Sequence, residues 1–309
     1  MLKSSIILPA YNCENTIEKL VNEVLNIFND CDIEIVIVND ASQDTTEKIC
    51  SELYKQNQEK LIFVSLMKNS GEHNAVMAGL RHATGEKIFI IDDDFQNPPS
   101  ELKKLYEFTL QNNYDVVYTK YDSKRHSFFR NLSSKFINVC ANFILNKPNN
   151  IYLSSFKSIN RSVVDKIIDY EGYGTYIDGL IFQITTNVGQ ITVEHFERQE
   201  GKSGYTFAKL LSLFNNFLFN YSLLPLRVLT TSGFFIIIFS IFISLQVIVE
   251  KFNNPAVPPG YSSTVLIIIF FSGLNLFFLG IMGEYVGRIL RMVNKKPQYS
   301  VRKILKKTN

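Results

Sequence analysis

The sequence predicts an α/β domain followed by two apolar segments that are long enough to cross a membrane. Through about residue 120, short apolar runs alternate with stretches of helical period, which is typical of a mostly parallel sheet with helices on both faces. The last third of the chain contains two long stretches without charge. A chain of 309 residues has room for one sizeable domain and a further part.

The elements of the domain follow from its periodicity and from its turn residues. Strands are predicted at Ser5–Leu8, Glu34–Val38, Leu61–Leu66, Lys87–Ile91 and Asp115–Tyr118. Helices are predicted from Ile17 to Phe28 and at Thr45–Gln56, Glu72–Ala83 and Leu102–Asn112. Beyond residue 128 the pattern is less regular, with helices at Asn131–Leu145, Arg161–Tyr170 and Tyr176–Asn187 and a strand at Ile191–Phe196.

The two uncharged stretches are predicted to be transmembrane helices. Val228–Val249 has about 22 residues and Thr264–Met282 about 19, enough for the hydrocarbon core of a bilayer. The loop between them carries only Lys251 as a basic residue, whereas eight basic residues follow Glu284. The excess of positive charge predicts an inner, cytoplasmic-membrane protein with both termini cytoplasmic.

The predicted organisation therefore has six parts. They are a cytoplasmic domain (1–205), an amphipathic juxtamembrane helix (206–226), a first span (227–250), a short extracytoplasmic loop (251–263), a second span (264–286) and a basic tail (287–309). The juxtamembrane helix fits either the membrane interface or a surface of the domain. The tail is suited to anionic lipids. The net charge of +3 is too small to suggest nucleic acid.

An acidic run follows the strand predicted at Lys87–Ile91. Asp92, Asp93 and Asp94 stand at the carboxyl end of a buried strand, where ligands bind in open α/β sheets. Removing three carboxylates from water costs free energy unless a cation lies among them. Their hard oxygen ligands suit Mg²⁺ or Mn²⁺. A solvated acidic turn is the alternative interpretation.

Two further motifs end predicted strands. Asp40 follows the second strand, where a carboxylate binds a nucleobase N–H or a ribose hydroxyl, or else caps the next helix. Gly71 opens a helix whose N-terminal amides suit a phosphate. His73, in the first turn of that helix, is by itself more typical of a structural residue.

In their order along the chain, these motifs resemble those of the family-2 inverting glycosyltransferases. The resemblance is carried by Pro9-Ala10-Tyr11-Asn12, Asn39-Asp40-Ala41-Ser42, Gly71-Glu72-His73-Asn74-Ala75 and Asp92-Asp93-Asp94-Phe95-Gln96-Asn97-Pro98-Pro99. Together with the acceptor-loop-like Glu197-Arg198…Gly201-Lys202-Ser203 and the two spans, they resemble the branch that glycosylates polyprenyl phosphates. Within it, the undecaprenyl-phosphate 4-deoxy-4-formamido-L-arabinose transferase type is the most similar.

The resemblance implies a nucleotide-diphospho-sugar transferase (GT-A, Rossmann-like) fold and a role for each matching residue. Asp92 and Asp94 would hold the metal, and the implied catalytic set is Asp92, Asp94, Gln96, Arg130 and Arg198. The donor would contact Pro9, Tyr11, Asn12, Asp40, Gly71, His73 and Asp93. The acceptor phosphate would contact Lys120, Arg130, Ser134, Arg198, Lys202 and Ser203. Arg130 as a surface helix residue is the alternative for that position.

The implied reaction moves a sugar from a nucleotide donor, expected to be a UDP-sugar, to undecaprenyl or another polyprenyl phosphate. The product would serve cell-envelope glycan or lipopolysaccharide modification. Its partners are a nucleotide sugar, a lipid phosphate and the membrane, and the sequence leaves a homo-oligomer open. Another acceptor such as diacylglycerol is the alternative, for which Asp93 or Asp178 would be the base. A non-catalytic membrane adaptor is a third reading, which the intact acidic run disfavours.

The chain also departs from the family pattern. Asn39 stands where Asp is usual, Glu72 where Gln is usual, and Lys120 where Arg is common. The segment that usually reads Asp-x-x-Ser-Gly-Phe-Arg is Ile151-Tyr152-Leu153-Ser154-Ser155-Phe156-Lys157. These differences bear on the identity of the transferred sugar more than on the type of reaction. The chain has no Trp, so it lacks the Gln-x-x-Arg-Trp motif of processive synthases, which argues against a polymerising enzyme.

Overall fold

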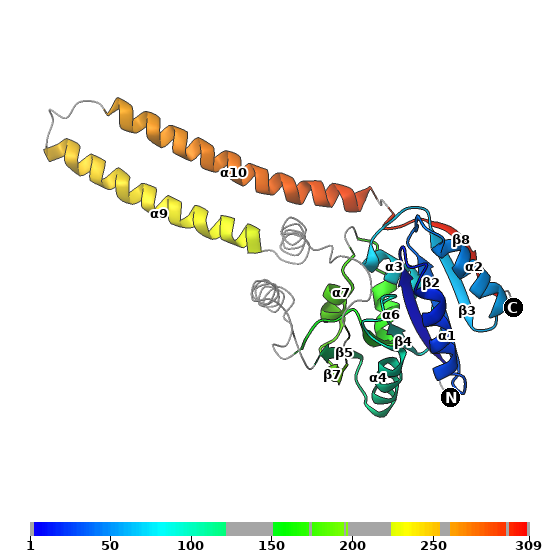
Figure 1. Cartoon of the computed structure of the whole chain (residues 1–309). Helices are drawn as coiled ribbons and strands as arrows, with labels where there is room; N and C mark the ends of the chain where they lie inside the picture. The colour runs from blue at the N-terminus through cyan, green and yellow to red at the C-terminus, as the bar shows by residue number, and fades with distance from the viewer. Residues whose placement is uncertain are drawn as a thin grey trace. The chain divides into compact units, whose positions relative to one another are not determined.

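The computed structural model describes residues 3–121, 151–172, 175–194, 196, 224–253, 260–294 and 297–307. The chain divides into two compact units, Met1–Thr206 with Lys295–Asn309, and Phe207–Asn294. The first is an α/β domain and the second contains two long helices (Figure 1).

The α/β unit is built on a mixed sheet with the strand order β7-β5-β6-β4-β1-β2-β3-β8. Its strands are β1 (Ser4–Ala10), β2 (Ile33–Asn39), β3 (Leu61–Leu66), β4 (Lys87–Ile90), β5 (Val116–Tyr121), β6 (Lys157–Asn160), β7 (Val188–Val193) and β8 (Val301–Leu305). Only β6 and β8 run antiparallel to their neighbours among the described strands. The prediction of a mostly parallel sheet is confirmed.

Helices cover both faces of this sheet (Figure 1). They are α1 (Ile17–Ile27), α2 (Thr46–Gln56), α3 (Glu72–His82), α4 (Pro99–Gln111), α6 (Arg161–Ile168) and α7 (Ile177–Ile184). Ile6 and Leu8 of β1 share one apolar core with α1, α2 and α4, while Ile7 shares the other with α3, α6 and α7. Successive strand residues point to opposite faces, so a strand buried on both faces reads as a continuous apolar run.

The predicted elements match the observed ones within a few residues, except in the second half of the domain. The helix predicted at Tyr176–Asn187 ends at Ile184, because Thr185 is extended and its Oγ1 hydrogen-bonds to Asp115 Oδ2 at 2.5 Å. The next strand then begins at Val188, earlier than the predicted Ile191. The helix predicted at 131–145 lies outside the described residues, as do positions 206–223 of the one predicted at 206–226, whose last three residues belong to α9 (Leu224–Asn253).

The segment predicted as a basic tail contains a strand of the sheet of the α/β unit. β8 pairs antiparallel with β3, and just before it Ser300 O accepts a hydrogen bond from Met67 N at 2.8 Å. The Gln298 amide donates to the carbonyls of Tyr170 and Gly172 at 3.0 and 2.8 Å. An edge strand commonly carries Lys and Arg, so its composition resembles that of a solvated tail. The predicted domain 1–205 is therefore incomplete without residues 297–307.

Removing residues 297–309 is expected to destabilise the α/β unit. The deletion exposes the hydrogen-bonding edge of β3. We therefore expect the midpoint of thermal unfolding to fall by about 2–4 °C or more, with increased aggregation. Thermal unfolding of the full chain and of the truncated chain in the same detergent measures the effect. A truncation after Leu305, which leaves β8 intact, is the control. Equal midpoints for the 297–309 deletion and the full chain would show that β8 contributes no stability.

The second unit contains α9 (Leu224–Asn253) and α10 (Tyr261–Val293), of 30 and 33 residues. The two spans predicted from the sequence, 227–250 and 264–286, lie within these helices. Among the described residues, one segment, Phe270–Gly287, is long and apolar enough to cross a membrane by length and composition. Large apolar side chains on both helices are exposed, including Phe235 at 64% and Leu276 at 70%.

Candidate active site

The loops that follow the first four strands share an unusual backbone conformation. Asn12, Ala41, Gly71 and Phe95 have positive φ angles of 51°, 55°, 87° and 55°, and they follow β1, β2, β3 and β4 respectively. Residues in this region cost free energy and cluster at functional sites, and Ala and Phe adopt it rarely. The backbone therefore marks the carboxyl edge of the parallel strands as the candidate site.

Side chains join these loops to one another. Tyr11 N donates to Asp93 Oδ2 at 3.2 Å, which connects the loop after β1 to the acidic run after β4. Asn12 Oδ1 accepts from Gln43 N at 2.8 Å and connects the loops after β1 and β2. The neighbours β1 and β4 flank the point where the strand order reverses, and open α/β sheets bind ligands at that point.

Asp40 holds the loop that leads into α3. The residue is 3% exposed, and its two carboxylate oxygens accept hydrogen bonds from Ser70 N and Gly71 N at 2.7 and 2.8 Å. Burial raises the pKa of Asp40, and the two N–H groups partly offset this. The alternative that Asp40 caps the helix following it is wrong, because the amides that it binds precede α3, whereas the N-cap of α2 is Thr45. The contact of Asp40 with a base or ribose stays a prediction.

The acidic run is half-buried, and its carboxylates are hydrogen-bonded to neighbouring groups. Ser155 Oγ donates to Asp92 Oδ2 at 2.5 Å, and Gln96 N donates to Asp94 Oδ1 at 3.1 Å. Burial and the charges of Glu72, Asp94 and Asp93 raise the pKa of Asp92 to about 7, despite the hydrogen bond from Ser155. Concentrated negative charge of this kind favours a bound cation.

The described residues contain no group of three or more His, Cys, Asp or Glu side chains that could hold a metal ion. Asp92 and Asp94 alone supply two carboxylates. Mg²⁺ commonly takes one or two carboxylates together with waters and substrate phosphates. The donor set therefore fits a divalent ion that binds together with a diphosphate.

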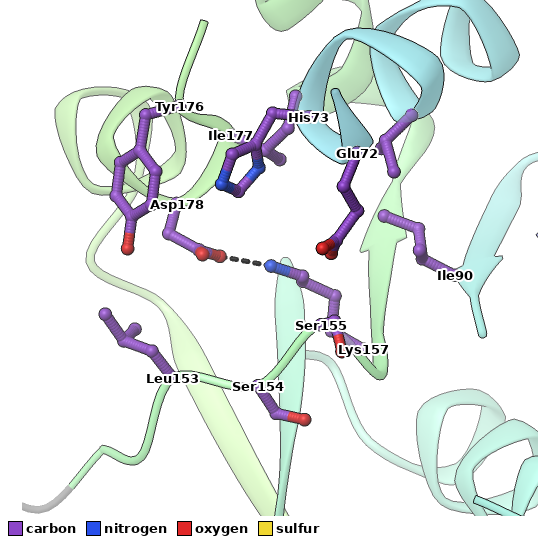
Figure 2. Close-up of a pocket in the computed structure, with 11 residues that line it drawn as sticks. Glu72, His73, Ile90, Leu153, Ser154, Ser155, Lys157, Tyr176, Ile177 and Asp178 are labelled. Atoms are coloured by element: carbon purple, nitrogen blue, oxygen red, sulfur yellow. Dashed lines mark hydrogen bonds and ion pairs between the residues drawn. The ribbon is translucent and has the colours of Figure 1, made fainter. Parts of the chain in front are cut away.

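A cavity of about 250 Å³ lies beside the start of α3 (Figure 2). Ser155, which binds Asp92, lines it, as does Ile90 at the end of β4. The other lining residues are Glu72, His73, Val76, Leu153, Ser154, Lys157, Tyr176, Ile177 and Asp178. They come from the start of α3, the segment leading into β6, and the start of α7.

A buried ion pair lies in this cavity. The side chains of Lys157 and Asp178 are only 4% and 8% exposed and are directly bonded (Figure 2). Tyr118 Oη donates to Asp178 Oδ1 at 2.7 Å. Burial raises the pKa of Asp178, but the charge of Lys157 and these two hydrogen bonds outweigh it and hold the pKa below its usual value. Asp178 is therefore a weak proton acceptor.

Glu72 and His73 form the opposite wall. The rings of His73 and Tyr176 meet edge to face, with centroids 4.9 Å apart. Burial lowers the pKa of His73, and the charge of Lys157 adds to this, so the imidazole is neutral near pH 7. Among the described residues, no hydrogen bond or ion pair engages the Glu72 carboxylate.

The predicted site residues fall into three groups. Tyr11, Asn12, Asp40, Gly71, His73, Asp92, Asp93, Asp94 and Gln96 lie together at the carboxyl edge. Pro9 is buried inside β1, and Lys120 is exposed on β5 without lining the cavity. Arg130, Ser134, Arg198, Lys202 and Ser203 lie outside the described residues.

Sequence reasoning assigned no role to Ser155 or Lys157, and it noted Glu72 only as a departure. All three stand where the chain differs from the family pattern, and all three line the cavity. The departures themselves were the available signal. Because Lys157 and Asp178 are 21 positions apart, nothing local in the sequence indicated their pairing.

Comparison with known proteins places these features in context. The family described as "Glycosyl transferase family 2" matches residues 5–168, a little over half of the chain. Two relatives named undecaprenyl-phosphate 4-deoxy-4-formamido-L-arabinose transferase, from Proteus mirabilis and Photorhabdus laumondii, are each 29% identical. They align with 98% and 99% of this chain and with 94% and 96% of their own lengths.

A solved structure shares the fold. Glucosyl-3-phosphoglycerate synthase from Mycobacterium tuberculosis, in complex with Mn²⁺, UDP and phosphoglyceric acid, superposes with a TM-score of 0.52 at 16% identity. The match covers 69% of this chain and 75% of that one. The GT-A-like fold expected from the sequence is thereby confirmed.

Proposed function

Because this chain belongs to glycosyl transferase family 2, we propose that it moves a sugar from a nucleoside diphosphate to a polyprenyl phosphate at a membrane. UDP is the expected nucleotide and undecaprenyl phosphate the expected acceptor. The names of the two full-length relatives support the acceptor, and the UDP and Mn²⁺ of the structural neighbour support the donor and metal.

The paired state of Asp178 is the observation that carries the choice of acceptor. A hydroxyl acceptor needs a base to remove its proton, whereas a phosphate monoester is already anionic and needs little help. Lys157 and Tyr118 occupy the Asp178 carboxylate and lower its basicity. Asp93, the other candidate base, accepts a hydrogen bond from Tyr11 N. This arrangement favours a phosphate nucleophile over diacylglycerol.

In this mechanism the chain mainly positions and neutralises charge. Asp92 and Asp94 would hold Mg²⁺ or Mn²⁺, which when bound neutralises the diphosphate of the donor. Gln96 would lie beside it. The acceptor phosphate would be held by cationic and hydroxyl side chains. Arg is suited to this because its planar guanidinium can donate two parallel hydrogen bonds to a phosphate. These cationic and hydroxyl side chains are Lys120, Arg130, Ser134, Arg198, Lys202 and Ser203. Attack on the anomeric carbon would invert its configuration as the nucleoside diphosphate departs.

We place the reaction at the cytoplasmic membrane, with α9 and α10 as two spans and both termini cytoplasmic. Their exposed apolar side chains and the excess of basic residues after Glu284 support this topology. A membrane-bound acceptor would then be concentrated beside the catalytic unit.

Purified full-length protein, incubated with labelled UDP-sugars and Mn²⁺, should glycosylate undecaprenyl phosphate and leave diacylglycerol unmodified. Asp178→Asn should keep a broad pH–rate profile on the lipid phosphate, because that carboxylate carries no proton in the reaction. Labelling of diacylglycerol alone would overturn the proposal. It would also be overturned if the transfer rate of the wild type rose with pH and Asp178→Asn abolished that rise.

Metal binding is expected to strengthen as the pH rises through about 7. Below that pH Asp92 holds a proton that the metal must displace, and above it the carboxylate is ionised. Between pH 6 and pH 8, the affinity for Mn²⁺ should rise by about tenfold. Mn²⁺ titration in the presence of UDP-glucose, whose diphosphate does not titrate in this range, measures it. Ser155→Ala removes a hydrogen bond to the ionised form and should move the rise to higher pH; a constant affinity would contradict this account.

A further inference from the structure

We propose that Gln298 is a positioning residue of the active site. It lies in residues 297–300, a segment that follows α10 in the chain and leads into β8, and that we call the strap. The strap binds two loops that lead to different walls of the cavity. Its contacts therefore set the geometry of the site in addition to stabilising the sheet. This inference rests on the proposed function and adds to it a residue that acts on the site from outside.

The side chain of Gln298 binds the loop that precedes α7. Its amide donates to the carbonyls of Tyr170 and Gly172 at 3.0 and 2.8 Å. Gly172 stands four positions before Tyr176, which lines the cavity, and α7 begins at the residue after Tyr176. Two donated hydrogen bonds from one side chain thus fix the backbone that leads into this wall.

The backbone of the strap binds the loop that leads into α3. Ser300 O accepts a hydrogen bond from Met67 N at 2.8 Å, and Arg302, at the start of β8, donates to Met67 O at 3.2 Å. Met67 directly follows β3, and the same loop then gives two amides to Asp40. The loop ends where α3 begins, and His73 in the first turn of α3 lines the cavity.

Between these two contacts, the ring of Tyr299 joins α3 to the end of α6. The guanidinium carbon of Arg81, in the last turn of α3, lies 5.8 Å from the centre of this ring. The same guanidinium donates to Ile168 O, at the end of α6, at 3.1 Å. The strap therefore connects the elements that carry His73 and Tyr176, whose rings meet across the cavity (Figure 2).

Gln298→Met tests the inference, because Met keeps the length of the side chain and has no hydrogen-bond donor. Full-length proteins in detergent are assayed at one temperature, below the unfolding midpoint of every variant. Calorimetric titration with UDP and Mn²⁺ counts the molecules that bind nucleotide. Transfer to undecaprenyl phosphate per UDP-binding molecule should fall by about tenfold or more, since small misplacements far from the reacting atoms reduce the rate on this scale. The affinity for UDP should be unchanged, because the contacts of Met67 remain.

Two variants separate positioning from stability. Leu305→Ala shortens a core-packed side chain of β8 that pairs with Phe63, away from both loops. It should lower the thermal midpoint without changing the rate per UDP-binding molecule. Gln58→Met removes an exposed amide that also donates to a backbone carbonyl, that of Lys55 at 3.3 Å, and it should change neither quantity.

An unchanged transfer rate in Gln298→Met would overturn the inference. So would a loss of rate that only parallels the loss of UDP-binding molecules, or an equal loss in Leu305→Ala. Amide hydrogen exchange in α7 provides a readout that needs no transfer, and Gln298→Met should accelerate it; equal exchange in both proteins would also contradict the positioning role. If the wild type transfers no sugar to the lipid phosphate while Gln298→Met accelerates exchange in α7, the proposed function fails and the positioning role stands.

Discussion

Asp94→Asn is expected to reduce sugar transfer by more than about a hundredfold while the fold remains intact. Loss of a residue that only hydrogen-bonds to a metal ligand already lowers metal affinity or activity by ~10–100-fold. Asp94 is one of only two carboxylates proposed to hold the ion directly. The neutral amide is also a far weaker ligand for a hard cation. Transfer rates at a series of Mn²⁺ concentrations measure the effect, and the variant should need much more metal.

Asp165→Asn provides the matched control for this substitution. Asp165 is an exposed residue of α6 whose ion-pair partner among the described residues is Arg161, one turn earlier, at 3.7 Å. Its loss should leave both the rate and the metal requirement unchanged. Near-normal turnover of Asp94→Asn with an unaltered metal requirement would remove Asp94 from the metal site.

Lys157→Met is expected to lower the free energy of unfolding by about 3–5 kcal/mol, because it leaves the buried Asp178 carboxylate without its cation. Urea unfolding of the full chain in detergent at pH 7 measures it. The loss should shrink as the pH falls, since protonation of Asp178 removes the uncompensated charge.

The double variant Lys157→Met with Asp178→Asn separates the pair from simple packing. It removes both charges, so its loss of stability should be smaller than that of Lys157→Met alone. If the double variant is as unstable as the single one, the effect comes from the shape of the side chain and the ion pair contributes little.

The sequence was sufficient for the elements that local patterns specify. Apolar runs such as Leu61–Leu66 and the helical period after Ile17 correspond to β3 and α1, and the acidic run lies at the predicted edge of the sheet. Each depends on residues close together in the chain, which is what periodicity can detect.

Features that depend on distant residues could not be predicted. β8 reaches β3 from more than 230 positions away, and its basic composition is shared by solvated tails and edge strands. The oxygens of Asp40 accept the amides of a loop 30 positions later, a contact that no local pattern indicates. The Lys157–Asp178 pair forms only when β6 and α7 meet, so the sequence alone does not distinguish Asp178 from a free carboxylate that could act as a base.

Identifying both products of one reaction tests the central claim most directly. The full-length protein is incubated with a UDP-sugar, Mn²⁺ and undecaprenyl phosphate, and the released nucleotide and the lipid are analysed by mass spectrometry. The account predicts UDP and a lipid carrying one phosphate and one sugar, because the bond that breaks is between the anomeric carbon and the diphosphate. Release of UMP with a lipid diphosphate-sugar would contradict it, since the reaction would then be transfer of a sugar phosphate.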